Sequence, residues 1–429
     1  MFETIVRYKA PNERSIFEDH HEKWDSALVS AHLLANSKKR VPKLLADLIE
    51  ERSLSYYIDP ILAEFRQGKS FRYENGNLRP WHEDYANELG DPFKRLLEDP
   101  GTVNARFLET ETIEQIAQDA IEFQETIVYR RLDEHLGKYE TLDVSREEAK
   151  PDAVIPWAHK LEKDQDYDAF RTIISASKVQ ATRPLRPVVY TSTAKIGRGK
   201  NRTELVNLLS NEDIGECFLL FEDLDKHETN ESEYKHIIDF VYDLASVGID
   251  PYFYYGDFFA NLLHDFGLKG TAYGTLHGEK YSESIKPKSK SSSSAISSRY
   301  YADKVKDFLQ IQAVVDTMSR ADEPVCDCEF CSRHFENWRD LAELDQADED
   351  EVETALQTVV MKHRILTRWE HARLVEEDEV EDVVENLQTD FKEIASEYRS
   401  SQQVASRKEL QYMQRWRKAV ENRTALLEN

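Results

Sequence analysis

Short β-prone runs alternate with helical patterns through the first two thirds of the chain, and this rhythm constrains the fold more than any other feature. Each run precedes a turn; the runs are 27–31, 55–58, 153–157, 187–191, 217–221, 252–255 and 271–275. Apolar residues at helical spacing separate several of them, as in 41–54, 234–247 and 258–266. Strands that alternate with helices predict an α/β fold with a parallel sheet.

The number of these units predicts a (β/α)8 TIM-like barrel, which usually spans about 250 residues. The eighth strand has no clear place in the sequence. A doubly wound sheet is the alternative, but no Gly-rich phosphate fingerprint follows any run. Residues 61–150 are predicted to be a charged helical insertion, and 284–298 a basic, Ser-rich loop. We expect a barrel domain over 1–320 and a helical subdomain over 321–429.

Composition places the chain among globular proteins and excludes several functions. Its 429 residues include 82 Asp and Glu against 56 Lys and Arg, a formal net charge of −26. This charge excludes general surface attraction to nucleic acid or anionic membrane, but not a local basic groove. No apolar run approaches the ~20 residues of a membrane span. With no signal-peptide pattern and only four cysteines, the expected location is the cytoplasm.

Three of the four cysteines lie in one tight C-x-C-x2-C segment, as Cys326, Cys328 and Cys331. Thiolates this close repel one another unless a cation neutralises them, and in a reducing cytosol the expected cation is zinc. A tetrahedral site needs a fourth ligand, and His363 is preferred because it projects from the apolar face of a predicted helix. The alternatives are His334 and His371. Four protein ligands predict a structural zinc site in the C-terminal subdomain.

This motif, followed after roughly thirty residues by a helical histidine, resembles the zinc site of the tRNA-guanine transglycosylase superfamily. In that family the zinc knuckle follows the last part of a (β/α)8 barrel. The segment 252–256, with 261–263 and Gly267, resembles the family's strand–Gly–helix–Gly region. The segment 55–59 resembles the strand that ends in the family's acid/base aspartate, which implies that role for Asp59.

The sequence departs from the tRNA-acting enzymes at several motifs. Residues 60–61 replace a Ser-Gly-Gly, 156–159 replace the base-gripping aspartate, and 271–274 occupy the nucleophile's position without an aspartate. The resemblance therefore implies a divergent branch, and we favour the one that exchanges guanine for a 7-deazaguanine base in DNA. The implied partners are DNA, a free 7-deazaguanine base and subunits of a DNA modification system.

Base exchange is a glycosyl (pentosyl) transfer that requires two acidic functions. One carboxylate attacks or stabilises C1′ of the sugar, and another moves protons on the bases. Both are expected at the carboxyl ends of barrel strands. Asp59 is the acid/base candidate, Asp257 the preferred nucleophile and Asp223 the second choice. Each could instead cap a helix at its βα turn.

Other residues near the same strand ends are candidates for substrate binding. Glu222 directly follows a predicted strand, and Trp157, Tyr255 and Tyr273 could stack a flipped base. Buried barrel aromatics are a common alternative. A basic, Gly-containing stretch after 187–191 suits phosphate contact. Its residues are Lys195, Arg198, Lys200 and Arg202. With the lysines of 284–298 they could form a groove; the alternative is a solvated surface loop.

Three functions remain open. The preferred one is a base transglycosylase acting on DNA, with a tRNA-guanine transglycosylase acting on tRNA as its alternative. The second is a non-catalytic, zinc-stabilised barrel subunit that binds nucleic acid, which the missing nucleophile favours. The third is an unrelated zinc-stabilised barrel hydrolase of small substrates.

Overall fold

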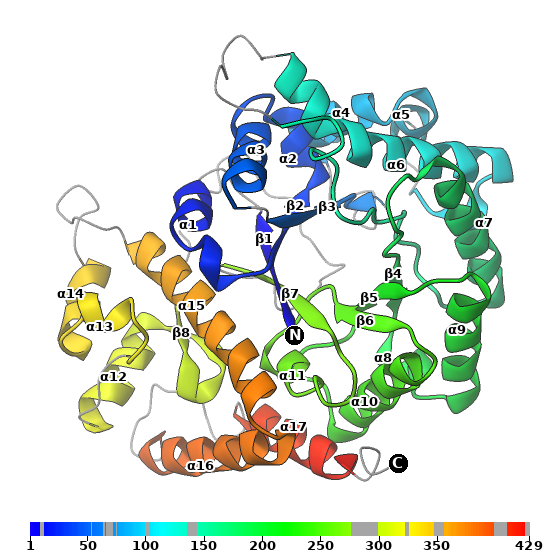
Figure 1. Cartoon of the computed structure of the whole chain (residues 1–429). Coiled ribbons are helices and arrows are strands. Elements are labelled where there is room, and N and C mark those ends of the chain that lie inside the picture. Colours follow the sequence, from blue (N-terminus) through cyan, green and yellow to red (C-terminus); the bar gives the residue numbers. More distant parts are fainter. Residues whose placement is uncertain are drawn as a thin grey trace.

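A computed structural model of the protein has a curled parallel sheet at its centre and helices around it (Figure 1). The residues that the structure describes are 1–8, 13–52, 54–62, 65, 72–73, 75–98, 103–134, 144–275, 299–321, 326–346, 356–398 and 410–424. The predicted basic loop 284–298 lies outside them.

Seven parallel strands form the sheet, in the order β3-β2-β1-β7-β6-β5-β4. Their bounds are β1 Glu3–Tyr8, β2 Ser26–Ser30, β3 Ser55–Asp59, β4 Val188–Thr191, β5 Glu216–Phe221, β6 Asp250–Phe253 and β7 Gly270–Gly274. Every predicted run except 153–157 became a strand of this sheet. The first strand, β1, was not predicted, and it pairs with both β2 and β7.

The run 153–157 is an irregular segment that lies along the open side of the sheet. The Asp152 N–H donates to the Tyr56 carbonyl of β3 at 3.2 Å. Isolated parallel bridges join Val154 to Leu185 and Lys160 to Tyr190 of β4. Proline has no N–H for a ladder, so Pro156 prevents a regular strand here. The predicted eight-stranded barrel is therefore observed only as a seven-stranded curled sheet.

Alternation along the strands separates an inner core from an outer one. Ile5 packs inside the sheet, whereas Val6 and Tyr8 pack against the surrounding helices. The inner core takes side chains from all seven strands and from the irregular segment; they include Leu28, Tyr57, Ile155, Tyr190, Phe218, Leu220, Tyr252, Tyr254 and Ala272. By the same alternation, Arg7 points into the sheet.

An arginine closes the amino end of this interior. Arg186 forms ion pairs with Glu216 at 2.6 Å and Glu3 at 3.3 Å. Its guanidinium lies 4.1 Å from the Tyr252 ring centroid and 4.5 Å from that of Tyr57. The amino end is thus filled by a paired charge and aromatic rings.

Helices cover the outer face of the sheet. They include α1 Arg14–Asp19, α2 Ala31–Asn36, α3 Arg40–Arg52, α7 Asp164–Gln180, α8 Thr193–Ile196, α9 Gly199–Asn211, α10 Glu231–Ser246 and α11 Phe258–Asn261. The predicted insertion after β3 is helical in its described part, with α4 Pro80–Glu88, α5 Asp91–Glu98 and α6 Thr110–Asp133. A capping box of Asn230 and Glu233 begins α10 and satisfies its free N–H groups.

The C-terminal part is a hairpin followed by helices beside the sheet (Figure 1, yellow to red). Its elements are β8 Arg299–Ala302, β9 Asp307–Gln310, α12 Ile311–Ala321, α13 Cys331–His334, α14 Trp338–Gln346, α15 Leu356–Glu377, α16 Val380–Tyr398 and α17 Gln411–Glu421. Asp307 joins the hairpin to the loop after β5 through Lys226 at 2.6 Å and His227 at 3.2 Å. Although burial opposes it, these cations lower the pKa of Asp307 to about 2.

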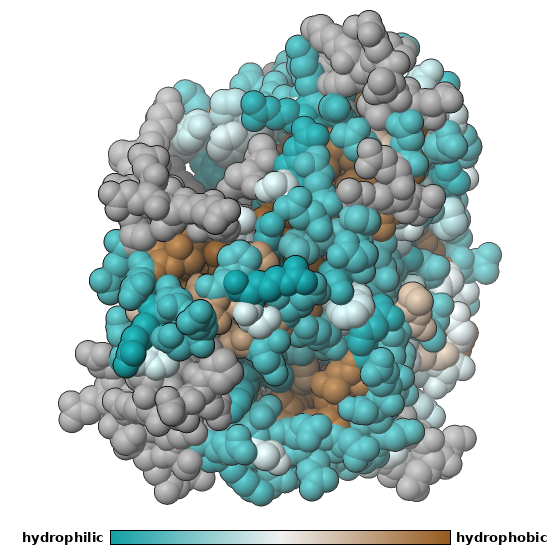
Figure 2. Space-filling model, turned by 60° about the vertical axis from the view of Figure 1, so that its left-hand side comes forward, coloured by the Kyte–Doolittle hydropathy of each residue, from teal (hydrophilic) through white to brown (hydrophobic). Residues whose placement is uncertain are grey.

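Hydrophilic residues cover most of the face shown in Figure 2, and hydrophobic residues show mainly in hollows between them. Among the described residues, no helix is both long enough and apolar enough to cross a bilayer.

Candidate functional site

Cys326, Cys328, Cys331 and His363 come together as predicted, in a cluster that could hold a metal ion such as zinc. One ligand atom from each lies within 4.8 Å of the others, and all but Cys326 are buried. The backbone N–H groups of Cys328 and Cys331 donate to the preceding thiols of the motif at 3.3 and 3.4 Å. Contacts with Cys326 and Cys331 lower the pKa of the Cys328 thiol to about 4, whereas the same contacts and burial raise the pKa of the Cys331 thiol, so Cys328 is the preferred thiolate of the pair.

His363, on α15, presents the nitrogen that a metal requires. Its Nε2 lies 2.8 Å from the Tyr301 carbonyl, which can only accept, so Nε2 carries the proton. Its Nδ1 then offers a lone pair and lies 3.4 Å from the sulfur atoms of Cys328 and Cys331. Tetrahedral zinc bonds predict a nitrogen–sulfur separation of about 3.6 Å. The Tyr300 ring stacks on the imidazole at 4.3 Å and fixes its orientation.

The two alternative histidines are engaged elsewhere. His334 is exposed, and its Nδ1 lies 2.9 Å from the Phe330 carbonyl. His371 binds Asp303 at 2.5 Å through Nε2. The set of three thiols and one imidazole fits zinc in a structural role, because protein atoms fill all four tetrahedral positions.

A second polar cluster lies at the carboxyl end of the sheet, which we call the mouth. Asp59, the last residue of β3, accepts from Arg7 Nη1 at 2.9 Å and from the Ile61 N–H at 2.8 Å. The exposed fractions are 1% for Arg7 and 5% for Asp59. Arg7 Nε also donates to the Tyr254 carbonyl at 3.1 Å, so one guanidinium ties β1 to both β3 and the end of β6.

Tyrosine rings surround this ion pair. The Arg7 guanidinium lies 3.7 Å from the ring centroid of Tyr255 and 4.3 Å from that of Tyr254. Burial and the Asp59 carboxylate raise the pKa of Tyr254 well above its usual range. The predicted residues Asp59 and Tyr255 are thus brought together, and Arg7 lies between them.

Glu222 and Lys160 form another charged pair. Lys160 contacts the carboxylates of Glu222 and, at 2.5 Å, Glu162. Phe218 and Leu220 point into the sheet, so alternation directs Glu222 to the same side just beyond β5. The mouth therefore contains a second buried cation beside a predicted carboxylate.

Asp257 caps the helix that follows its own strand, the alternative that its position left open, whereas Asp223 contacts the start of α8, whose N-cap is Ser192. Asp257 Oδ1 accepts from the Phe259 N–H at 3.0 Å and begins α11. Burial and this carboxylate raise the pKa of Tyr234, a residue of the outer core. Asp223 accepts from both the N–H and the hydroxyl of Thr193 at 2.8 Å, at the start of α8. Their catalytic roles stay predictions.

Trp157 and Tyr273 are buried in the outer core, which agrees with the alternative that they are buried barrel aromatics.

The predicted basic residues differ in how exposed they are and in how firmly they are bound to other residues. Arg198 and Lys200 are exposed, and Lys200 has one weak contact with Glu204 at 3.6 Å. Arg202 is bound to α10 through Asp243 and Asp239. Lys195 donates to the Glu162 carbonyl at 3.0 Å.

The sequence reasoning missed Arg7 and Lys160. Arg7 was missed together with its strand, although the β-branched and aromatic residues of 2–8 were a usable signal. Lys160 follows the run 153–157, and nothing local marks it as a partner of Glu222.

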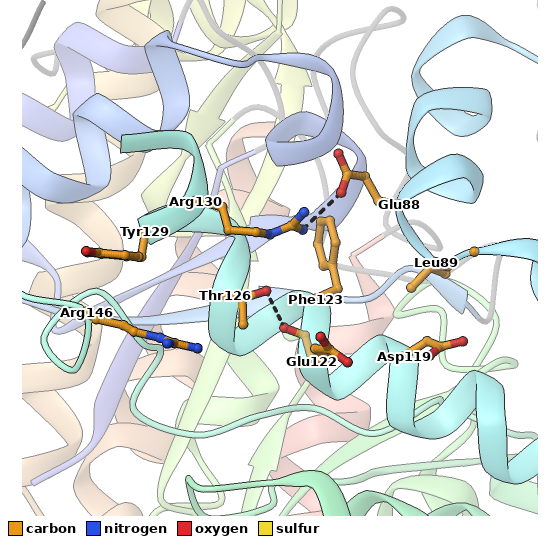
Figure 3. Close-up of a pocket in the computed structure, with 10 residues that line it drawn as sticks. Glu88, Leu89, Asp119, Glu122, Phe123, Thr126, Tyr129, Arg130 and Arg146 are labelled. Atoms are coloured by element: carbon orange, nitrogen blue, oxygen red, sulfur yellow. Dashed lines mark hydrogen bonds and ion pairs between the residues drawn. The ribbon is translucent and has the colours of Figure 1, made fainter. Parts of the chain in front are cut away.

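A cavity of about 500 Å³ lies on the helical insertion rather than at the mouth (Figure 3). It is lined by residues of α4, α6 and the segment after α6, among them Glu88, Asp119, Glu122, Tyr129, Arg130 and Arg146. Arg130 crosses it to reach Glu88 at 3.0 Å. None of the predicted site residues lines it, so it lends no support to the predicted chemistry.

No family model and no curated protein matches the chain. A solved structure described as a fructose-1,6-biphosphate aldolase from Coccidioides immitis is 10% identical, with a TM-score of 0.35, over 87% of this chain and 90% of that one. The intracellular xylanase TsXylA from Thermoanaerobacterium saccharolyticum is 11% identical, with a TM-score of 0.33, over 68% and 89%. At these TM-scores neither likeness bears on function.

Proposed function

We propose that this protein is a zinc-stabilised enzyme that exchanges guanine for a 7-deazaguanine base in DNA. The observation that carries the proposal is the Cys326, Cys328, Cys331 and His363 cluster. The motif that resembles the transglycosylase superfamily assembles in space with its histidine nitrogen turned toward the thiols. Cysteines that were close in the sequence only by chance would not be expected to meet a distant histidine whose free nitrogen faces their thiols.

The mouth supports the same proposal through its carboxylates. Asp59 ends β3, the position that the resemblance gives to the acid/base residue, and it is buried among polar partners. Glu222 lies beyond β5 and is the second mouth carboxylate. In the proposed reaction Asp59 moves protons on the leaving and incoming bases, and Glu222 or Asp257 faces C1′ of the sugar. The zinc stabilises the fold and takes no part in the transfer.

We also propose that the irregular segment 152–161 replaces the eighth strand of a (β/α)8 barrel. It supplies Ile155 to the inner core and is bonded to the strands on both sides of it. This arrangement would make the mouth a closed ring, as barrel enzymes require for strand-end chemistry.

A base-exchange assay tests the proposal. The whole protein is incubated with DNA or with tRNA and labelled guanine, and the nucleosides are analysed by mass spectrometry. We expect label in DNA, and none after Asp59→Asn, which keeps the shape of the side chain. Asp168→Asn is the matched control because Asp168 is exposed on α7. Label in tRNA alone would replace the DNA substrate with tRNA.

A non-catalytic subunit that binds nucleic acid is the second candidate. It is favoured because Asp257 and Asp223, the two predicted nucleophiles, each accept the N–H groups of a helix start. DNA binding without exchange of any base, under conditions where the zinc site is filled, would support this candidate and exclude the enzyme.

A further inference from the structure

Tyr300, on strand β8, contacts two members of the metal cluster at once. Its hydroxyl oxygen lies 2.9 Å from the Cys331 sulfur. Its ring is nearly parallel to the His363 imidazole, with an interplanar angle of 14° and ring centroids 4.3 Å apart. The side chain is fully buried. One tyrosine of the hairpin therefore joins a ligand of the cysteine motif to the ligand on α15.

The three sulfur atoms of the cluster receive hydrogen bonds from different sources. The Cys328 N–H donates to the Cys326 sulfur at 3.3 Å, and the Cys331 N–H donates to the Cys328 sulfur at 3.4 Å. Both bonds come from the backbone of the C-x-C-x2-C motif. For the Cys331 sulfur, the last of the motif, the hydroxyl in contact among the described residues is that of Tyr300. The third sulfur thus meets a side chain from another segment.

The direction of this hydrogen bond follows once a metal is bound. Cysteine binds zinc as the thiolate, which has no proton, so the bond runs from the Tyr300 hydroxyl to the Cys331 sulfur. Three thiolates around Zn²⁺ leave one net negative charge inside the protein. Buried charge is costly unless hydrogen bonds compensate it. A hydroxyl that donates to Cys331 provides part of this compensation.

The same strand also holds the histidine. The Tyr301 carbonyl, next to Tyr300 in β8, lies 2.8 Å from His363 Nε2 and fixes its proton there. The Thr367 hydroxyl donates to the His363 carbonyl at 2.9 Å, so its proton is not directed at Nδ1. Nδ1 lies 3.4 Å from the Cys331 sulfur. Strand β8 therefore positions one imidazole and one thiolate relative to each other.

We propose that Tyr300 is a positioning residue of the metal centre: its hydroxyl donates to the Cys331 thiolate while its ring orients the His363 imidazole, and it thereby raises the affinity for zinc. Residues that hydrogen-bond metal ligands act in this way because they orient the ligands and tune their basicity. The inference rests on the zinc that the proposed function places in this cluster, but it does not depend on base exchange. The cysteine motif gives no indication of Tyr300, which lies 31 residues before Cys331.

Competition between the zinc-loaded whole protein and a chelator tests this assignment. Tyr300→Phe removes the hydroxyl but keeps the buried ring, so the fold should survive. We expect it to bind zinc about 10–100-fold more weakly than the wild type, the usual loss when a hydrogen-bond partner of a metal ligand is removed. Tyr56→Phe is the matched control, because the Tyr56 hydroxyl is also buried but donates to the Ala149 carbonyl. Its zinc affinity should equal that of the wild type.

Replacing zinc with cobalt gives a readout that packing alone does not change. Cobalt(II) bound to thiolates absorbs light by charge transfer from sulfur to metal, and a hydrogen bond to the sulfur weakens its electron donation. The charge-transfer band of cobalt-loaded Tyr300→Phe should therefore lie at a longer wavelength than that of the wild type, and the band of Tyr56→Phe should not move.

Two results would overturn the inference and leave the zinc site in place. One is wild-type affinity and band position in Tyr300→Phe; the other is weaker binding with an unmoved band, which would reduce Tyr300 to a packing role. A wild type that binds no metal would instead overturn the zinc site and this inference together.

Discussion

The ion pair between Arg7 and Asp59 should be among the most sensitive positions in the protein. Arg7→Met keeps the length and apolar stem of the side chain but removes its charge. Asp59 then remains buried and keeps the hydrogen bond from the Ile61 N–H, but it loses the cation that lay 2.9 Å away. The bond from Arg7 Nε to the Tyr254 carbonyl is lost as well.

The expected cost follows from this burial. Removing one partner of a buried ion pair typically lowers the free energy of unfolding by about 3–5 kcal/mol. For a chain of 429 residues, an unfolding entropy of ~2.1 cal/mol/K per residue gives about 0.9 kcal/mol/K in total. The melting temperature should therefore fall by about 3–6 °C. The exposed pair of Arg171 and Asp168 should lose no more than ~1 kcal/mol in Arg171→Met.

A double-mutant cycle separates the pair from its surroundings. Arg7→Met, Asp59→Asn and the double variant are melted under one set of conditions. We expect the double variant to be more stable than the sum of the single losses predicts, because it leaves no uncompensated charge. Strictly additive losses, or an Arg7→Met melting temperature equal to that of the wild type, would refute the reasoning about this pair.

Three further results are expected. Metal analysis should find one zinc per chain, and Cys328→Ser should lose it together with several degrees of melting temperature; a metal-free wild type would contradict the cluster's role. The lowered pKa of Asp307 stabilises the folded protein above pH ~4, and this contribution is lost as the pH falls through about 2. Urea titrations should therefore show that Asp307→Asn loses about 2–3 kcal/mol less free energy of unfolding than the wild type over this pH range. If DNA binds the exposed basic residues, Arg198→Ala with Lys200→Ala should reduce the salt dependence of binding, whereas Arg202→Ala should not.

The sequence was most informative where a local pattern determines the structure. Continuous apolar runs predicted β2 to β7 because strands buried on both faces have no polar positions. The strand β1 was missed because no helical pattern or turn precedes it. The run 153–157 was wrong as a regular strand because Pro156 interrupts it. The helical insertion was predicted from its charge and length, without its packing.

In the candidate site, too, features encoded by a local sequence pattern were predictable and features that depend on the fold were not. The spacing of the cysteines and the apolar helix that carries His363 predicted the metal cluster, since these signals lie in two short segments. The position of Asp59 at a strand end was also predictable. Its partner Arg7 is 52 residues away in the sequence, and Lys160 is 62 residues from Glu222, so only the fold brings these charges together. No local pattern distinguished a capping aspartate such as Asp257 from a catalytic one.

The central position of β1 has a consequence for how the protein folds. Within each of two groups, β1 to β3 and β4 to β7, strands that are consecutive in the sequence are also neighbours in the sheet. The two groups are joined by the ladder between β1 and β7, which pairs Glu3 with Gly270. So distant a pairing costs loop-closure entropy and slows folding. Until it forms, both strands are unpaired edges on half-built sheets, and such edges promote aggregation. We expect refolding yield to depend steeply on protein concentration, with the joining of the two halves as the slow step.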